Sequence, residues 1–150
     1  MNKSTILACV LSLSSVAGAC PNLAGDFNFS SSSSLSVSQN QDDAGVVTYK
    51  MTVDDHNCAV CKYDNVMRAD GRTVRKDYSV TNRVEYTTIT CEDNRLKFRQ
   101  TTDTFDSSGE KITSYSENYD YRINSDSDLV VEDIREGVPY SKTVHTRTNN

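Results

Sequence analysis

The chain has 150 residues, a formal net charge of −5 and a mean hydropathy of −0.59. No run of basic residues occurs in it, which argues against nucleic acid and anionic membrane surfaces as partners, because both favour clusters of Lys and Arg. The length is typical of one domain.

The first nineteen residues have the pattern of an export signal. Lys3 supplies the positive charge, residues 6–16 form a short apolar core, and small residues at 17–19 precede Cys20. The core is shorter than the ~20 residues of a membrane-spanning helix. We therefore expect residues 1–19 to be a signal peptide and residues 20–150 to form a single, exported β-barrel domain, secreted or periplasmic. Loss of Lys3 with the signal takes the net charge from −5 to −6.

The small residues before Cys20 also resemble a bacterial lipobox, in which the cysteine is acylated and anchors a lipoprotein in the membrane. The cysteine count separates the two outcomes. Cys9 leaves with the signal, so four cysteines remain, and they can form two disulfides in three connectivities. Acylation of Cys20 would leave one of the other three unpaired. We favour soluble export and expect the disulfides to involve Cys20, Cys58, Cys61 and Cys91, tying the Cys58–Cys61 region to Cys91 and the N-terminus.

Residues 22–29 have the alternation of a strand, with Leu23, Gly25 and Phe27 on one side. This opening resembles the L-x-G-x-W opening of lipocalins and related calycin barrels, with Phe27 in the place of Trp. Asp77-Tyr78 resembles the T-D-Y-type turn of lipocalins. Arg147 stands for the late arginine that lipocalins place under the aromatic ring. The resemblance implies a calycin-like barrel.

Further strands are expected along the middle of the chain. Residues 46–53 alternate with Val47 and Tyr49 inward. Asp70-Gly71 has the composition of a two-residue type I′ hairpin turn, so we expect the strands on either side of it to pair. Residues 127–136 have two interpretations: a helix capped by Ser127, or a strand, which the run 129–131 favours.

Cys58 and Cys61 have a C-x-x-C spacing with three interpretations. A zinc site would recruit His56 and Cys91, and a redox pair would require a helix start beside it. We favour structural disulfides, because exported cysteines oxidise readily. His56 and His145, the two histidines, match no catalytic motif. We therefore expect no catalytic residue, no cofactor and no metal, and a protein that is not an enzyme.

Residues 84–148 read as one extended run after another, separated by turn-forming residues at 92–94, 106–109 and 124–126. Their period of two puts alternate side chains on opposite faces of a strand. We count about 8–10 strands with no crossover helix. The predicted fold is all-β: a single antiparallel up-and-down meander that closes into a barrel, because closure removes the two free edges.

Polar residues interrupt the apolar faces of these runs, which is typical of a small-ligand site with apolar walls and few polar groups. Glu117 in such a lumen would need a cationic group or water as its partner. Alternatively, Glu117 marks a break between two strands or faces solvent at the mouth of the barrel. The candidate ligand-binding residues are Tyr86, Thr88, Phe98, Gln100, Tyr115, Glu117 and Tyr119.

Two functions compete. The first is a non-enzymatic binding protein that holds a small, partly apolar molecule in the barrel. The second is a protein-interaction module of the inhibitor or adhesion type, with a filled barrel and, if Cys20 is acylated, a lipid anchor. An open cavity would favour the first, and a solid core with an exposed aromatic patch the second. An outer-membrane barrel is excluded, because the faces opposite the tyrosines are polar where lipid requires an apolar band.

Overall fold

The structure, a computed structural model, describes residues 19–58 and 61–148. The predicted signal peptide therefore lies outside the described residues, apart from Ala19. One short 3-10 turn, Ser79–Thr81, interrupts the strands. In the described part of the chain, no helix has the length and apolar character needed to cross a bilayer. The ten strands are β1 (Gly25–Ser30), β2 (Ser33–Gln41), β3 (Val47–Asp55), β4 (Lys62–Arg68), β5 (Thr73–Tyr78), β6 (Arg83–Glu92), β7 (Arg95–Phe105), β8 (Lys111–Ile123), β9 (Leu129–Arg135) and β10 (Val138–His145).

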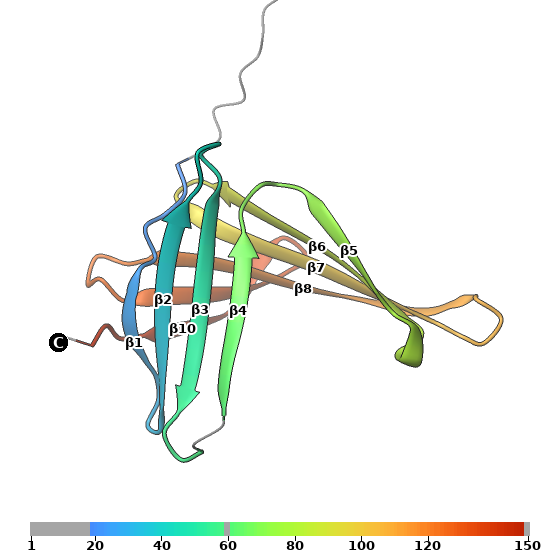
Figure 1. The fold of residues 1–150 in the computed structure, drawn as a ribbon, viewed down its shortest axis with the longest axis horizontal. Helices are drawn as coiled ribbons and strands as arrows, with labels where there is room; N and C mark the ends of the chain where they lie inside the picture. The colour runs from blue at the N-terminus through green and yellow to red at the C-terminus, as the bar shows by residue number, and fades with distance from the viewer. Residues whose placement is uncertain (1–18, 59–60, 149–150) are drawn as a thin grey trace, which may run out of the picture.

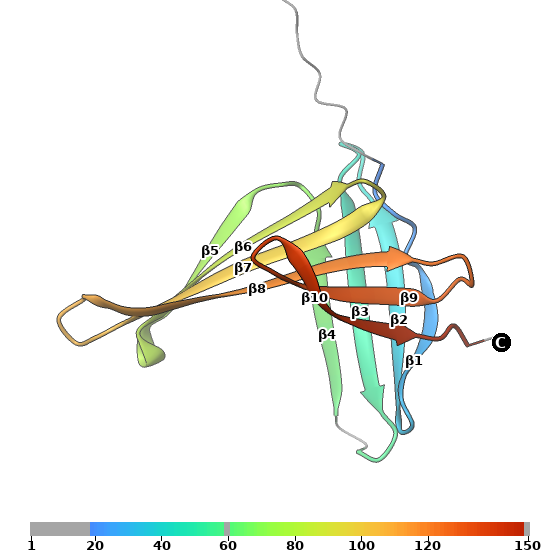
Figure 2. The same ribbon diagram turned by 180° about the vertical axis from the view of Figure 1, so that it is seen from behind.

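The strands form two antiparallel sheets. One has the order β1-β2-β3-β4 and the other the order β10-β9-β8-β7-β6-β5. Each strand within a sheet pairs antiparallel with its neighbour in sequence, so the prediction of an all-β, antiparallel fold is confirmed, whereas the single meander that we expected is divided into two sheets. The strands of the two sheets run across each other, and β6, β7 and β8 continue well past β4 (Figure 1; Figure 2 from behind).

The two sheets are joined differently on their two sides. On one side, the chain after β10 lies along β1. Phe27 and Arg147 form an isolated antiparallel β-bridge through their backbones, and the Asn28 amide donates to the Thr146 carbonyl at 2.9 Å. On the other side, β5 pairs with β6 and β4 pairs with β3, and no ladder joins β4 to β5 in the described residues. The architecture is therefore two sheets, and closure into a barrel is not established.

The predicted hairpin at Asp70-Gly71 is wrong. The chain passes here from one sheet to the other, so the strands on either side of the turn have different partners. Gly71 has a φ of +72°, as the turn requires, but its amide donates to the carbonyl of Ile89 on β6 at 3.0 Å. A two-residue signal specifies the local reversal of the chain. The pairing of the strands depends instead on which arrangement of the whole sheet buries the apolar side chains.

The segment after Ser127 is a strand, as we favoured, and the helical alternative is wrong. Asn124 organises the turn before it, because its side-chain oxygen accepts the amide protons of Asp126 and Asp128 at 3.0 and 2.8 Å. Ser127 has a φ of +68°, which is left-handed rather than the extended conformation of a helix cap. Leu129 and Val130 then enter β9 fully buried.

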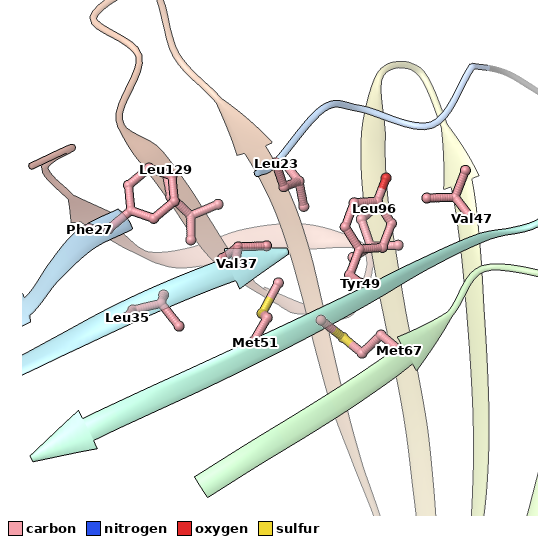
Figure 3. Close-up of a cluster of buried hydrophobic side chains, with 10 residues drawn as sticks. All are labelled: Leu23, Phe27, Leu35, Val37, Val47, Tyr49, Met51, Met67, Leu96 and Leu129. Carbon is pink, nitrogen blue, oxygen red and sulfur yellow. The ribbon is translucent and has the colours of Figure 1, made fainter. Parts of the chain in front are cut away.

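The core lies where the two sheets cross (Figure 3). Tyr49 is fully buried there, and its hydroxyl donates to the Pro21 carbonyl at 2.6 Å, which fixes the segment before β1 against β3. Burial raises the pKa of the Tyr49 hydroxyl to about 12. The buried cluster comprises Leu23, Phe27, Leu35, Val37, Val47, Tyr49, Met51, Met67, Leu96 and Leu129.

All four cysteines predicted to form disulfides do so, as Cys20–Cys91 and Cys58–Cys61. The expected tie between the Cys58–Cys61 region and Cys91 is wrong, because Cys58 and Cys61 bond to each other. The first disulfide joins the N-terminal segment to β6 across 71 residues, whereas the second closes a loop of sequence separation 3. The alternative zinc set is not assembled, since each of these sulfurs is bonded to another sulfur. Cys61 leads into β4, so the described residues beside this pair contain no helix start of the kind expected of a redox pair.

Candidate binding surface

The inner face of the six-stranded sheet continues beyond the core and becomes open to solvent. Paired residues of neighbouring antiparallel strands point to the same face, and Leu96 in the core identifies that face as the inner one. Along β8, Tyr121 packs against the core, whereas Tyr115 is 47% exposed. We name the outlying part the open face. Its members are Val74, Lys76, Tyr78, Arg83, Glu85, Thr87, Gln100, Thr102, Thr104, Thr113, Tyr115 and Glu117.

Five of the seven candidate ligand-binding residues share the inner face. Phe98 pairs with Tyr119 at the border of the core, with ring centres 6.1 Å apart. Gln100 pairs with Glu117, and Tyr115 pairs with Thr102, so these positions belong to the open face. Glu117 is exposed, which matches the alternative in which its carboxylate faces solvent.

The other two candidates, Tyr86 and Thr88, lie on the opposite face of the sheet. Tyr86 pairs with Arg75, and the Thr88 hydroxyl is 2.7 Å from that of Thr73. Both β6 registers carry β-branched or aromatic residues, so alternation alone did not separate them. The signal that does is Cys91: its disulfide lies inside, and it shares its register with Ile89, not with Tyr86.

A hydrogen-bonded cluster occupies the far end of the open face. The Arg83 guanidinium donates to Glu85 at 3.1 Å and to the Tyr115 hydroxyl at 2.9 Å. The Tyr78 hydroxyl donates to the other Glu85 oxygen at 2.9 Å. Four side chains from three strands are thereby held in fixed positions. Sequence reasoning missed Arg83, Glu85 and Tyr78. The one sign in the sequence is that Arg83 and Glu85 are two residues apart and therefore lie on the same face of β6.

Two polar atoms at this end are buried without a partner in the described part of the chain. They are the Thr102 hydroxyl oxygen and Arg83 Nε. Thr102 is 1% exposed although it lies on a largely open surface. Buried polar groups are normally hydrogen-bonded, so the cluster satisfies most, but not all, of its own donors and acceptors.

The tyrosines change character from the core outward. Burial raises the pKa of Tyr121 to about 12, with a contribution from neighbouring Tyr119. Burial also raises the pKa of Tyr119, and the nearby carboxylates of Glu117 and Asp133 add to the shift. Both rings are neutral hydroxyl donors near pH 7. The inner face is therefore aromatic at its border with the core and becomes hydroxyl-rich and charged further out.

Neither histidine forms a catalytic constellation in the described residues. His56 Nε2 lies 3.2 Å from the Ser34 hydroxyl on an exposed part of β2, and among the described residues no carboxylate bonds to the other ring nitrogen. His145 is buried, stacks on Phe29 with ring centres 5.1 Å apart, and lies 3.3 Å from the Asn28 carbonyl. A triad needs a base that a third group orients, and neither histidine has this arrangement.

The outer face of the same sheet carries a second charged cluster. Glu132 and Asp120 are 7% and 6% exposed, and arginines on neighbouring strands neutralise them. Arg122 donates to Glu132 at 3.0 Å, and Arg95 and Arg99 form the remaining ion pairs. Burial raises the pKa of Glu132, but the hydrogen bonds and charges of Arg122 and Arg95 outweigh it and leave this pKa below its ordinary value. Three arginines surround two carboxylates, and both buried carboxylates are ion-paired within the chain, which indicates a structural role.

An open hollow lies at the other end of the sheets, beside the Cys20–Cys91 disulfide. It is an open groove of about 760 Å³ between the β2–β3 turn, the β4–β5 crossing and the β6–β7 turn. Small residues such as Gly45 and Gly71 line it together with the side chains of Gln39 and Thr90. None of the seven predicted site residues lines it.

No protein-family model, no curated protein and no solved structure matches this chain. The lipocalin-like resemblance of residues 23–27 is therefore a prediction from the sequence alone.

Proposed function

We propose that this protein is an exported, non-enzymatic interaction module that binds a protein partner through the open face. The observation that carries the proposal is Tyr115, which is 47% exposed yet held by Arg83 in a cluster spanning three strands. Tyrosine and arginine are enriched at protein interfaces, and a side chain fixed in advance loses little entropy when a partner binds.

The space where the two sheets cross is filled by buried side chains, which supports a protein partner over a small molecule. The residues at the crossing, including Phe27, Tyr49 and Leu96, are fully buried and leave the exposed aromatic surface outside the core. Export is supported by the two disulfides, which suit an oxidising compartment. A soluble form is supported by Cys20, because its sulfur bonds to Cys91 and is then not available for acylation.

A small ligand inside a calycin-like barrel is the second candidate. Two observations favour it: the Arg147 guanidinium lies over the Phe27 ring, as the resemblance to lipocalins implies, and the groove beside Cys20–Cys91 measures about 760 Å³. The groove is open at the surface, whereas small-ligand sites enclose most of their ligand. We therefore place this candidate second.

Photocrosslinking tests the proposal. A photoreactive phenylalanine analogue replaces Tyr115 in one variant and Tyr86, on the opposite face of the same sheet, in the matched control. We expect crosslinks to a protein of the host's exported fraction from position 115 only. With that protein purified, Tyr115→Ala should weaken binding about tenfold or more, and Tyr86→Ala should not. A small molecule found by native mass spectrometry, together with no crosslink at position 115, would support the second candidate instead.

A further inference from the structure

Strand β5 is a free edge of the six-stranded sheet. Its residues pair with β6 on one side, and on the other side no described strand pairs with them. Thr73 to Asp77 are all exposed, and only Tyr78 is half-buried. Such an edge presents unpaired amide and carbonyl groups in the geometry of a strand, which is a template for the addition of another strand.

The edge is basic in a protein that is otherwise acidic. Arg72, Arg75 and Lys76 fall within five residues, in a chain of net charge −5. Arg75 forms an exposed ion pair with Asp77 at 2.7 Å, and in the described part of the chain Arg72 and Lys76 form none. Exposed pairs contribute little and leave the cations accessible.

Strand β4 precedes β5 in the chain and is an edge strand of the four-stranded sheet. It lacks the basic character of β5. Its Asp64 pairs with Lys50 at 2.8 Å, and its Arg68 pairs with both Asp42 and Asp70. On β4, only Lys62 has no ion pair among the described residues, whereas the β5 segment has two such cations, Arg72 and Lys76. An electrostatic preference for a partner strand is therefore concentrated at β5.

We propose that an extended, acidic segment of the protein partner adds to the six-stranded sheet as a further strand alongside β5. The inference rests on the proposed function, since it specifies how the partner is held. The open face reaches this edge through its β5 members, Val74, Lys76 and Tyr78. A strand added here would therefore extend the same surface. Carboxylates that alternate along the added strand would lie beside Arg75 on the outer face or beside Lys76 on the open face, where opposite charges on adjacent strands stabilise pairing.

Two other occupants are disfavoured by charge. A second copy of β5, paired antiparallel with Arg75 opposite Lys76, would bring like charges onto adjacent strands, and such pairs destabilise a sheet. The first 18 residues of this chain contain no Asp or Glu, so they do not complement the edge.

Peptide binding to the full mature chain tests the inference. The ligand is a fluorescent (Val-Glu)₄ peptide, and the controls are (Val-Lys)₄ and a (Val-Glu)₄ peptide with alternate amides N-methylated to block strand pairing. Fluorescence anisotropy gives the dissociation constants, and amide hydrogen exchange locates the bound peptide. The variant Arg75→Glu/Lys76→Glu reverses the charge of β5. Its matched control is Lys142→Glu, an exposed lysine on β10, the opposite edge strand.

We expect (Val-Glu)₄ to bind at least about tenfold more tightly than either control peptide, and to slow amide exchange in β5. The β5 variant should lose about tenfold or more in affinity, whereas Lys142→Glu should retain it. Equal binding of the N-methylated peptide, protection away from β5, or a concentration-dependent dimer that excludes the peptide would overturn the inference. If crosslinking at Tyr115 succeeds while these results fail, strand addition is wrong and the proposed function stands; failure of the crosslinking refutes the function itself.

Discussion

The guanidinium of Arg147 lies 5.0 Å from the centre of the Phe27 ring and occupies the space that a side chain at position 25 would need. Arg147 Nη2 donates to the Ala24 carbonyl at 3.1 Å, and Nε donates to the Ser127 carbonyl at 2.9 Å. One side chain thus connects the start of β1, the turn before β9 and the segment after β10. This contact joins the two ends of the meander on the side where β1 and the C-terminal segment meet.

Gly25→Ala should destabilise the protein because the new methyl group would displace this guanidinium. A Cβ at position 25 would lie 2.6 Å from Arg147 Nη1, and Gly25 has a φ of +156°, which other residues rarely adopt. We expect a loss of about 1–3 kcal/mol in the free energy of unfolding, measured by urea denaturation.

The double variant Gly25→Ala/Arg147→Ala separates the two causes. Without Arg147 the steric clash disappears, while the backbone strain at position 25 remains. The sum of the two single losses in unfolding free energy should therefore exceed the loss in the double variant by about 0.5–2 kcal/mol. Strict additivity would mean that the guanidinium moves aside at no cost.

Alkaline pH should destabilise the protein through its buried tyrosines. The pKa of Tyr121 is raised from 10.0 to about 12 by burial. A raised folded-state pKa gives stability that is complete below pH 10 and is lost as pH rises toward 12, because the unfolded chain releases its proton first. Tyr121→Phe should therefore make the fall in stability between pH 10 and 12 shallower, as followed by urea denaturation. The exposed control Tyr140→Phe should leave the slope unchanged.

Acid should act through Glu132, whose pKa is lowered. A lowered folded-state pKa gives stability that is present above the ordinary value of 4.5 and is lost as pH falls below it. Glu132→Gln would leave Arg122 and Arg95 without their buried partner, so we expect a loss of about 1–3 kcal/mol near pH 7 and a weaker acid dependence. Glu110→Gln, at an exposed turn position, is the control. A Glu132→Gln variant as stable as the native chain would show that solvent already screens the cluster.

The two disulfides should differ in their contribution to stability. Replacing both cysteines of Cys20–Cys91 by alanine removes a cross-link over 71 residues and should cost about 4 kcal/mol. The same replacement at Cys58–Cys61, with a separation of 3, should cost about 1–2 kcal/mol. Urea denaturation of the non-reduced proteins measures both, and thiol titration of the native chain should find no free thiol among the four. Equal losses would contradict the loop-entropy explanation.

Alternation and turn composition were sufficient to predict most local structure. The alternating apolar residues of 46–53 predicted β3, and the Asn and Asp residues at 124–126 marked the turn before β9. Both signals are local: strand side chains have a period of two, and Asn or Asp bonds to the backbone two residues on. The cysteine count also predicted two disulfides, because it depends on compartment and parity.

Tertiary structure decided which side chains of β6 face inward. It also decided which strands pair on either side of the Asp70-Gly71 turn. Tyr86 and Ile89 suit either face of a strand, and the inner face is identified by the disulfide of Cys91 with Cys20 and by the pairing of Cys91 with the buried Leu96. The cluster of Arg83, Glu85 and Tyr115 joins residues 32 apart in the chain, so no sequence window contains it. The amino-acid sequence by itself determined that the chain forms antiparallel strands, since that depends on neighbours along the chain. Which face is covered, where the sheets separate and which side chains meet on the open face depend on contacts between distant strands, which only the folded chain brings together.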